Sequence, residues 1–280
     1  MNSPRPTVAE KRKTFRKLHE TGCFVIPNPW NVGTARYLQG LGFKALATTS
    51  GGHAHSLGFA DGLQSREAVL AHCRELVAAT DVPLNADFEN GFADDPDGVA
   101  DSVTRCVATG VAGLSIEDSP KGDKPLYDFD LSVARVKAAR AAVDRAGGDV
   151  VFTARAENFI RGVPDLDDVI RRLKAYAAAG ADCLYAPGIK TREQIAAVVK
   201  AVAPKPVNFL GGAFGFTVND LAKMGVRRIS VGGSLARVAM HAFIRVATEI
   251  ANEGRFDGFA DLTTNAALNK FFSEDRKKLS

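Results

Sequence analysis

Short runs of apolar and β-branched residues alternate along this chain with longer alanine-rich segments, in which apolar residues recur at helical spacing. Runs of the first kind are typical of buried strands. They predict strands at Cys23–Ile26, Ala45–Thr49, Val82–Asp87, Gly113–Glu117, Val150–Arg155, Cys183–Ala186, Pro206–Phe209 and Arg228–Val231. The other segments predict helices near Val32–Leu41, Ser65–Ala79, Pro96–Thr109, Leu131–Ala146, Leu166–Ala179, Thr191–Val202, Val218–Met224 and Ser234–Glu253.

Glycine follows several predicted helices, as at Gly110 and Gly180, and an apolar run then begins the next strand. This alternation predicts parallel strands joined by crossover helices. Repeated units of this kind favour a closed (β/α)8 barrel of the TIM type in a single domain, residues 1–280; an open doubly wound sheet is the alternative. An N-terminal helical segment (1–21) and a C-terminal helical extension (254–280) lie outside these units. We expect them to cap the barrel or to reach a partner subunit.

Composition and charge narrow the function classes. Hydrophobic residues make up 46% of the chain and charged residues 24%, as in an ordinary soluble globular protein. The net charge of +4 is small, and the basic residues gather near the two ends, which argues against nucleic-acid binding. No apolar run is long enough for a membrane helix and no secretory signal is visible, so we expect a cytoplasmic protein. The cysteines are widely spaced without a CxxC pair, which indicates reduced, structural thiols.

Acidic side chains end the predicted third and fourth strands. Alternation along a strand sends Asn85, Asp87 and Glu89 to the same side, and Glu117 ends the following strand. Because the carboxyl ends of barrel strands form the active face, we expect these acids at the barrel mouth. Clustered carboxylate oxygens suit Mg2+, with Mn2+ as an alternative ion. Helix capping or pairing with arginine is the other interpretation, and capping is expected for some of Asp94, Asp95 and Asp97.

Polar residues also end the predicted fifth and seventh strands. Arg155 pointing inward either balances the acids or grips a substrate carboxylate bidentately, and Glu157 is placed to orient it. Asn208 is a candidate for a hydrogen bond to a ligand. The glycine pairs Gly211-Gly212 and Gly232-Gly233 fit either a phosphate site or ordinary turns.

The segment after the predicted second strand is rich in small polar residues. Close backbone approach at Ser50-Gly51-Gly52 would present N–H groups to an anionic group or an oxyanion. His53 and His55 lie nearby, but two histidines without a third fixed partner make a weak zinc signal. The sequence therefore favours anion binding over a zinc site here.

Several motifs occur together in a characteristic order. They are Pro27-Asn28-Pro29-Trp30-Asn31, Thr49-Ser50-Gly51 with Leu57-Gly58-Phe59-Ala60-Asp61, Ala86-Asp87-Phe88-Glu89-Asn90-Gly91, Gly113-Leu114-Ser115-Ile116-Glu117-Asp118 and Ala154-Arg155-Ala156-Glu157. From about Gly22 to Glu253 the chain resembles the isocitrate lyase/phosphoenolpyruvate mutase superfamily. The resemblance implies an α/β barrel whose eighth helix is exchanged between subunits of a dimer or a dimer of dimers. It also implies Mg2+ at the mouth and a small oxo-acid or dicarboxylate substrate.

The resemblance further implies a role for each matching residue. Asp87 would be the direct metal ligand, with Asp61, Glu89 and Glu117 around the ion largely through waters. The substrate would be held by Trp30 as an aromatic wall, by Ser50, Gly51 and Gly52, and by Arg155, Glu157 and Asn208. The residues expected to take part in the chemistry are Asp61, Glu117, Lys121 and Arg155.

Two departures from the family pattern bear on the reaction. The lyase branch carries a Lys-Lys-Cys-Gly-His loop after the fourth strand, but residues 119–128 contain no cysteine and also lack the Lys-Thr-Asn-Ser type of loop of the mutase branch. The proton donor is therefore open among Lys121, Asp123 and Tyr127. In addition, the usual Asp-x-Asp of the third strand reads Asp87-Phe88-Glu89, which lengthens the second acid by one methylene.

Three functions remain in view. The leading one is a Mg2+-dependent lyase-type reaction that makes or breaks a C–C bond next to the carboxylate of a small α-oxo acid, through an enolate-like intermediate. Substrates like oxaloacetate or 2-methylisocitrate fit it. The second is P–C chemistry on phosphonopyruvate, with Lys121, Lys124 or Lys190 as phosphonyl partners. The third is a catalytically silent barrel that only binds an oxo acid.

Overall fold

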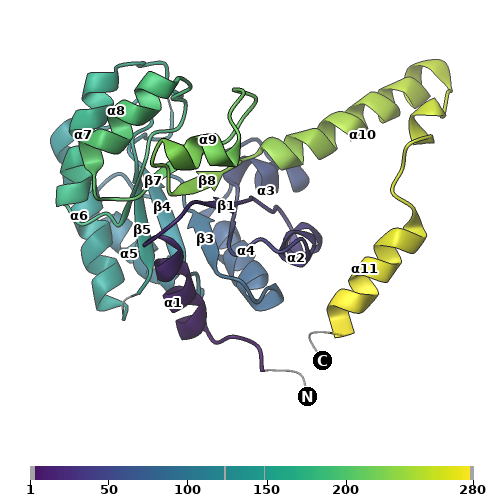
Figure 1. Cartoon of the computed structure of the whole chain (residues 1–280), viewed down its shortest axis with the longest axis horizontal. Helices are drawn as coiled ribbons and strands as arrows, with labels where there is room; N and C mark the ends of the chain where they lie inside the picture. The colour runs from purple at the N-terminus through teal and green to yellow at the C-terminus, as the bar shows by residue number, and fades with distance from the viewer. Residues whose placement is uncertain (1–3, 123, 148, 278–280) are drawn as a thin grey trace.

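The computed structural model describes residues 4–122, 124–147 and 149–277, and within them eight parallel strands form one sheet (Figure 1). The strands are β1 (Phe24–Ile26), β2 (Leu46–Ala47), β3 (Leu84–Asp87), β4 (Gly113–Glu117), β5 (Val151–Arg155), β6 (Cys183–Tyr185), β7 (Val207–Leu210) and β8 (Arg228–Ser230). Their order is β1-β8-β7-β6-β5-β4-β3-β2. The eight predicted strands are confirmed, with ends that differ by at most two residues.

The two outermost strands in this order, β1 and β2, meet and bring the sheet close to a closed barrel. The backbone N–H of Ala47 donates to the Pro27 carbonyl at 3.0 Å. The buried Asn28 amide donates to the Thr48 carbonyl at 2.8 Å and accepts from the Val231 N–H at 2.9 Å. One side chain thus links the ends of β2 and β8 across the seam. The predicted TIM-type barrel is confirmed, and the open sheet is excluded.

Helices alternate with the strands. They are α1 (Val8–Leu18), α2 (Val32–Gly40), α3 (Ser50–Ser56), α4 (Arg66–Ala79), α5 (Pro96–Val107), α6 (Phe129–Arg145), α7 (Leu166–Ala178), α8 (Arg192–Val202), α9 (Val218–Lys223), α10 (Ser234–Glu253) and α11 (Asn265–Lys277), with a short 3-10 helix η1 (Asp257–Phe259). Local capping explains many starts: Thr7, Asn31, Thr191 and Thr217 each begin a capping box. Sequence analysis missed α3, whose seven residues include two glycines that weaken any helical signal.

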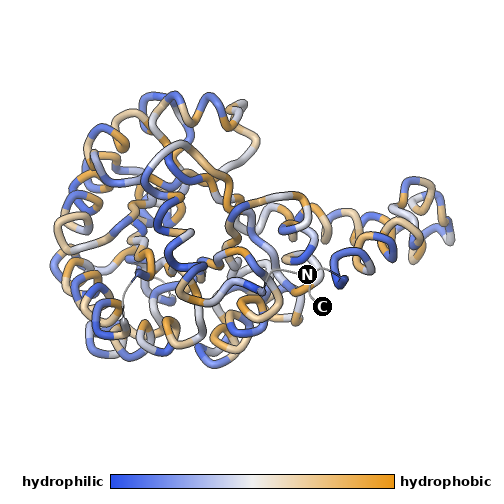
Figure 2. Tube along the Cα trace, turned by 60° about the horizontal axis from the view of Figure 1, so that its bottom comes forward, coloured by the Kyte–Doolittle hydropathy of each residue, from blue (hydrophilic) through white to orange (hydrophobic). Residues whose placement is uncertain are grey.

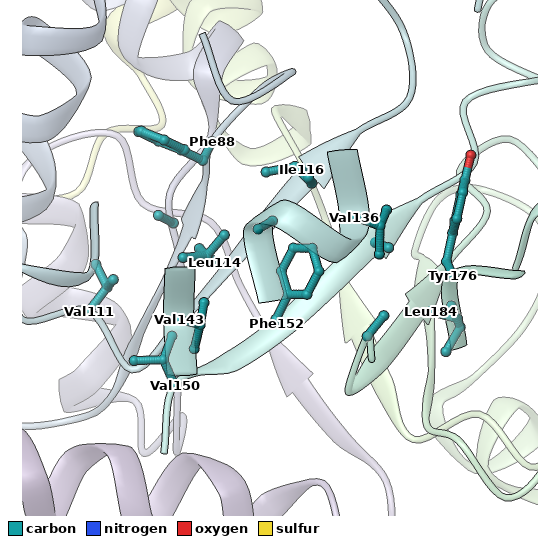
Figure 3. Packing of buried hydrophobic residues seen from close by; sticks show 14 of the residues in the cluster. Phe88, Val111, Leu114, Ile116, Val136, Val143, Val150, Phe152, Tyr176 and Leu184 are labelled. Carbon is teal, nitrogen blue, oxygen red and sulfur yellow. The ribbon is translucent and has the colours of Figure 1, made fainter. Parts of the chain in front are cut away.

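Buried apolar residues form two clusters on opposite sides of the sheet. The larger cluster lies between the strands and the surrounding helices, and Figure 3 shows part of it, with Leu114 and Phe152 from β4 and β5 beside Val136 and Val143 from α6. The smaller cluster contains Phe15, Ile26, Ala45, Ala47, Ala112, Val151 and Cys183. Phe15 belongs to α1, so the N-terminal helix contributes a fully buried ring to this cluster. Through this ring α1 packs against the barrel, and the division into an N-terminal segment at 1–21 stays a prediction.

The C-terminal extension leaves the barrel and then returns to it. Helix α10 projects away from the rest of the molecule in both views (Figures 1 and 2), and none of its twenty residues is buried. The chain then turns back, and α11 packs on α2, where Arg36 and Asp275 form a buried ion pair at 2.6 Å. Among the described residues no helix is long and apolar enough to cross a membrane.

Candidate functional site

A cavity of about 760 Å³ opens at the carboxyl ends of the strands. Its wall includes residues that follow β2, β3, β4, β5 and β8, and residues of β7. Of the predicted site residues it contains Ser50, Gly51, Gly52, Asp61, Asp87, Glu89, Glu117, Lys121, Arg155, Glu157 and Asn208. The barrel places the strand ends together because parallel strands in one closed sheet all finish on the same face.

Asp87 ends β3 and lies between two partners. Its Oδ1 accepts from Arg155 Nη1 at 2.9 Å, and its Oδ2 accepts from the Ser50 backbone N–H at 3.1 Å. The Asp87 N–H donates in turn to Thr48 Oγ1 at 2.8 Å. The carboxylate is therefore held in one orientation at the cavity wall by groups from β2, α3 and β5.

Glu89 reaches the cavity by a different route from the one predicted. Strand β3 ends at Asp87, and Glu89 has a left-handed backbone with φ of 46°, so strand alternation does not explain its direction. Its carboxylate nevertheless lines the cavity, where it forms an ion pair with Lys121 at 3.0 Å. Lys121 Nζ also donates to the Gly62 carbonyl at 2.8 Å. The loop after β4 is thereby fastened across the cavity to the loops after β2 and β3.

Arg155 joins three carboxylates. Its Nη1 lies 2.9 Å from Asp87 Oδ1 and 3.0 Å from Glu117 Oε1, and its Nε lies 2.7 Å from Glu157 Oε1. The register of β4 and β5 sets Glu117 directly beside Arg155. The structure is compatible with both predicted roles of Arg155. It balances the acids in this arrangement, and its place on the cavity wall also suits contact with a substrate carboxylate.

The pKa values of this cluster reflect burial and crowding. Burial raises the pKa of Glu117 well above its usual value; Arg155 opposes the rise, and the charges of Glu157 and Asp87 add to it. Burial likewise raises the pKa of Glu89, against the effect of Lys121. For Arg155, burial alone would lower the pKa, but Glu117, Glu157 and Asp87 raise it well above normal. In this cluster the four carboxylates of Asp87, Glu89, Glu117 and Glu157 thus face two cations, Arg155 and Lys121.

The segment 50–52 is helical where a loop was expected. Ser50, Gly51 and Gly52 form the first turn of α3, and the N–H of Gly52 donates to Thr49 Oγ1 at 3.3 Å. A Cβ on Gly51 would lie 3.0 Å from Asp61 Oδ2, and one on Gly52 would lie 2.7 Å from Thr49 Cγ2. Glycine is needed here because Asp61 and Thr49 approach the backbone so closely.

The aromatic residue that lines the cavity is not the one that was predicted. Trp30, predicted as the aromatic wall, is absent from the cavity lining; it lies before α2, and its carbonyl is 3.4 Å from His53 Nδ1. Tyr185, at the end of β6, lines the cavity instead, and the Arg155 guanidinium lies 5.0 Å from its ring centroid. Sequence analysis missed Tyr185, although the same strand-end criterion that selected Arg155 would have found it.

The candidate proton donors of the 119–128 loop differ in whether they line the cavity. Lys121 lines the cavity, whereas Tyr127 is absent from its lining and its hydroxyl bonds to Asp94 and Asn90. Burial and Asp94 raise the pKa of Tyr127 to about 12. Asp123 lies outside the described residues. The other candidate cations for a phosphonyl group, Lys124 and Lys190, do not line the cavity either.

A buried network supports the cavity from behind. Asp118, next to Glu117, accepts from the Glu157 N–H at 2.8 Å and from Tyr176 Oη at 2.6 Å, and it pairs with Arg172 at 3.2 Å. Arg172 also donates to the Tyr127 carbonyl at 3.2 Å. Asp118 is thus committed to positioning the backbone of β5 and the 119–128 loop.

The carboxylates that line the cavity can be compared with the ligands that Mg2+ requires. Among the described residues no three His, Cys, Asp or Glu side chains enclose an ion by themselves. All the candidate donors are carboxylate oxygens around one cavity. The pKa values of Glu117 and Glu89 are raised, and a nearby cation would lower them by favouring the ionised carboxylates. Such a set fits a hard cation that keeps several of its waters. Of the two histidines noted in the sequence, His55 lines the cavity, whereas His53 does not and stacks on His72.

Comparisons with known proteins agree with this geometry. The sequence profile of the phosphoenolpyruvate phosphomutase family matches residues 15–251. An oxaloacetate decarboxylase from Paraburkholderia xenovorans is 30% identical over 83% of this chain and 79% of its own length. A Burkholderia cenocepacia crystal structure, provisionally assigned as a lyase/mutase, is 46% identical with a TM-score of 0.92, covering 95% of this chain and 97% of that one.

A solved structure with a bound metal is also similar. The complex of phosphonopyruvate hydrolase with oxalate and Mg2+ is 26% identical with a TM-score of 0.82, covering 96% of each chain. The family profile spans most of the barrel, and the named relatives include C–C lyases and P–C hydrolases. The chain therefore belongs to the phosphoenolpyruvate mutase/isocitrate lyase superfamily of enzymes.

Proposed function

We propose that this protein is a Mg2+-dependent lyase that breaks or forms a C–C bond next to the carboxylate of a small α-oxo acid, oxaloacetate-like or 2-methylisocitrate-like. The observation that carries the proposal is the acidic cavity at the strand ends, in which Asp61, Asp87, Glu89 and Glu117 surround space beside Arg155. Relatives named oxaloacetate decarboxylase and 2-methylisocitrate lyase support this substrate class.

We assign metal binding and substrate binding to different residues of the cavity. Asp87 would hold Mg2+, with Asp61, Glu89 and Glu117 around it. The metal would supply positive charge that favours the enolate form of the oxo acid. Arg155 would contact the substrate carboxylate, and Glu157 keeps it oriented through the 2.7 Å ion pair. Ser50, Gly51 and Gly52 would bind the oxygens of the oxo acid through backbone and hydroxyl groups, as the close packing of this turn allows.

The loop after β4 is suited to exclude water from the cavity. Lys121 fastens it to Glu89 and to the Gly62 carbonyl, and Arg161, from the loop after β5, donates to the carbonyls of Gly122 and Lys124 at 2.9 and 3.0 Å. A closed loop strengthens charge interactions beneath it by removing solvent. Opening and closing of this loop would admit substrate and release product.

P–C bond chemistry on phosphonopyruvate is the second candidate, because the matching family profile and one similar structure have that chemistry in their names. It would need cations placed for the phosphonyl group. Of the three lysines considered, only Lys121 lines the cavity, and it is already paired with Glu89. Arg161, Arg228 and Arg237 also line the cavity, so the preference for C–C chemistry rests on the relatives named oxaloacetate decarboxylase and 2-methylisocitrate lyase.

We also propose that the protein is a homodimer or homotetramer in which α10 packs on a partner subunit. Helix α10 exposes several large apolar residues, namely Leu235, Val238, Met240, Phe243 and Ile244. Apolar faces of this size are normally covered in soluble proteins. An exchanged α10 would cover its own face and complete the partner's helical layer.

The test is incubation of the purified protein with Mg2+ and oxaloacetate, 2-methylisocitrate, isocitrate or phosphonopyruvate, followed by NMR. Each substrate is run with EDTA and without enzyme, because oxaloacetate decarboxylates spontaneously. Mg2+-dependent product from a C–C substrate is the expected result. Product from phosphonopyruvate alone would support the second candidate, and binding without turnover of any compound would indicate a silent oxo-acid-binding barrel.

A further inference from the structure

A buried arginine at the inner part of the cavity has no acidic partner. Arg228, on β8, is 3% exposed and lines the cavity. Its Nε donates to Asn208 Oδ1 at 2.8 Å and its Nη2 to Thr153 Oγ1 at 3.0 Å. Within the part of the chain that the structure describes, no carboxylate lies within ion-pair distance of it. A buried charge that only neutral groups solvate is costly, so its retention calls for an explanation.

The third partner of Arg228 is a histidine that is held neutral. His19 Nδ1 lies 2.8 Å from the Phe15 carbonyl, which assigns the ring hydrogen to Nδ1 and leaves Nε2 as an acceptor 3.3 Å from Arg228 Nη1. Burial, and next the Arg228 charge, lower the pKa of His19 to about 3. All three recorded partners therefore accept hydrogen bonds without cancelling the positive charge.

A chain of hydrogen bonds runs from this cation toward Tyr185. Arg228 Nε donates to Asn208 Oδ1, and Asn208 Nδ2 donates to Ser230 Oγ at 3.0 Å. The Ser230 hydroxyl in turn acts to lower the pKa of Tyr185. Hydrogen bonds in such a chain strengthen one another. The register of β6, β7 and β8 builds it, because Tyr185 is paired with Asn208, and Asn208 with Arg228.

Tyr185 is mostly buried, but it lines the cavity beside a second cation. Arg155 lies over its ring at 5.0 Å. Burial raises the pKa of Tyr185 to about 12, and the charges of Glu157 and Asp87 add to the rise, whereas Arg155 and Ser230 act to lower it. The phenol is thus protonated at neutral pH, and Arg155 stabilises the phenolate that it would leave behind.

We infer that Tyr185 is the proton donor of this site, and that Ser230, Asn208 and Arg228 position it and stabilise its phenolate. The inference rests on the proposed function. When an oxaloacetate-like substrate is cleaved, the C–C bond to the departing carboxylate breaks, CO2 leaves, and the electron pair of that bond enters the enolate of the remaining oxo acid. The proton of Tyr185 Oη then passes to the enolate carbon: a C–H bond forms, the O–H bond breaks, and its electron pair stays on the phenolate. A solvent proton restores the phenol.

The test compares wild type with Tyr185→Phe in two assays. The first is Mg2+-dependent turnover of whichever oxo acid the wild type cleaves, and the second is calorimetric binding of oxalate, a mimic of the enolate. We expect turnover to fall by about 100-fold or more, as for loss of a general acid, with the oxalate dissociation constant within about threefold of wild type, the small change expected when truncation removes no ligand contact. Tyr37→Phe, at an exposed site on α2, is the matched control and should behave as wild type.

Ser230→Ala tests the chain without touching Tyr185. It should lower turnover by a smaller factor. Because the Ser230 hydroxyl acts to lower the pKa of Tyr185, its loss should raise that pKa and shift the alkaline limb of the pH–rate profile to higher pH. A purely structural role would leave that limb in place. Wild-type turnover in Tyr185→Phe would overturn the inference. A silent wild type that still binds oxalate would instead overturn the proposed function, so the two failures are distinguishable.

Discussion

Asp87 makes the most restrained set of contacts among the acids of the cavity. Arg155, the Ser50 N–H and the Thr48 hydroxyl fix its carboxylate and backbone from three directions. A ligand fixed in this way loses little entropy when it binds a metal. At the scale of single residues, Asp87 is therefore where metal binding should be most sensitive to substitution.

Asp87→Asn keeps the shape but removes the charge and one acceptor oxygen, so it loses the bond from Arg155 or the bond from the Ser50 N–H. We expect Mg2+ affinity, measured by calorimetry, to fall by at least the roughly 100-fold that loss of an outer-shell partner can cost. Thermal unfolding without metal should change little. Asp97→Asn, an exposed acid in the first turn of α5, is the control. Unchanged Mg2+ affinity in Asp87→Asn would remove this residue from the metal site.

The raised pKa of Glu117 predicts a pH dependence of stability. Its folded pKa lies above the usual value of 4.5, so between these two values the folded state binds more protons than the unfolded state. The free energy of unfolding therefore falls as the pH rises through that window, by about 1.4 kcal/mol for each unit of difference. Glu117→Gln should flatten this fall and raise stability at pH 8.

Urea unfolding at several pH values in EDTA checks this prediction. Adding Mg2+ to the wild type should restore stability at pH 8, because the cation compensates the carboxylates. An equally steep fall in Glu117→Gln would show that other groups cause the pH dependence. Glu75→Gln, an exposed acid outside the cavity, controls for the loss of one charge.

Helix α1 shows how one element fixes the inner end of the barrel. Phe15 is fully buried in the smaller core cluster, and His19, one turn later, accepts from Arg228. The ring also limits its neighbours, since a Cβ on Gly113 of β4 would lie 2.5 Å from Phe15. The helix was predicted as a separate segment, but its side chains complete the barrel core.

Phe15→Ala should therefore destabilise the whole barrel. Truncation of a buried phenylalanine costs about 3–5 kcal/mol, because the cavity that it leaves collapses only in part. Chemical unfolding measures the loss directly. Leu41→Ala, which is 60% exposed at the end of α2, should cost little by comparison. A loss below about 1 kcal/mol for Phe15→Ala, the range of volume-conserving swaps, would contradict this account.

The whole molecule is asymmetric. Helix α10 projects from the barrel (Figure 2). Helix α11 lies against the barrel again, where the Arg36–Asp275 ion pair holds it to α2. Large exposed apolar residues gather on α10, and such residues are normally covered in soluble proteins. The projecting helix therefore motivates the oligomer proposed above.

Phe243→Asp tests the proposed oligomer. Phe243 is 66% exposed in the single chain, so the substitution should cost the isolated subunit little. In a complex that buries this ring, a carboxylate would be desolvated without a partner, and we expect dissociation to smaller species by light scattering. Glu249→Gln on the same helix is the control. A wild type that is monomeric at micromolar concentration would refute the proposal.

The comparison of sequence and structure separates local from long-range information. The strands, most helices and the acids at strand ends could be predicted, because residue periodicity and strand-end position are local properties. Glu89 was placed correctly for a wrong reason, since a left-handed residue and not strand alternation turns it inward. Helix α3 was missed because its glycines hide the helical signal.

What the sequence by itself determined is the barrel and the gathering of Asp87, Glu117 and Arg155 at one face, while the single domain stays a prediction. Only the tertiary structure decided which aromatic residue lines the cavity, Tyr185 rather than Trp30. It alone revealed the pairing of Arg228 with His19, 209 residues apart. The physical reason is that strand stagger and helix docking, which are set by packing of the whole barrel, determine which distant side chains meet.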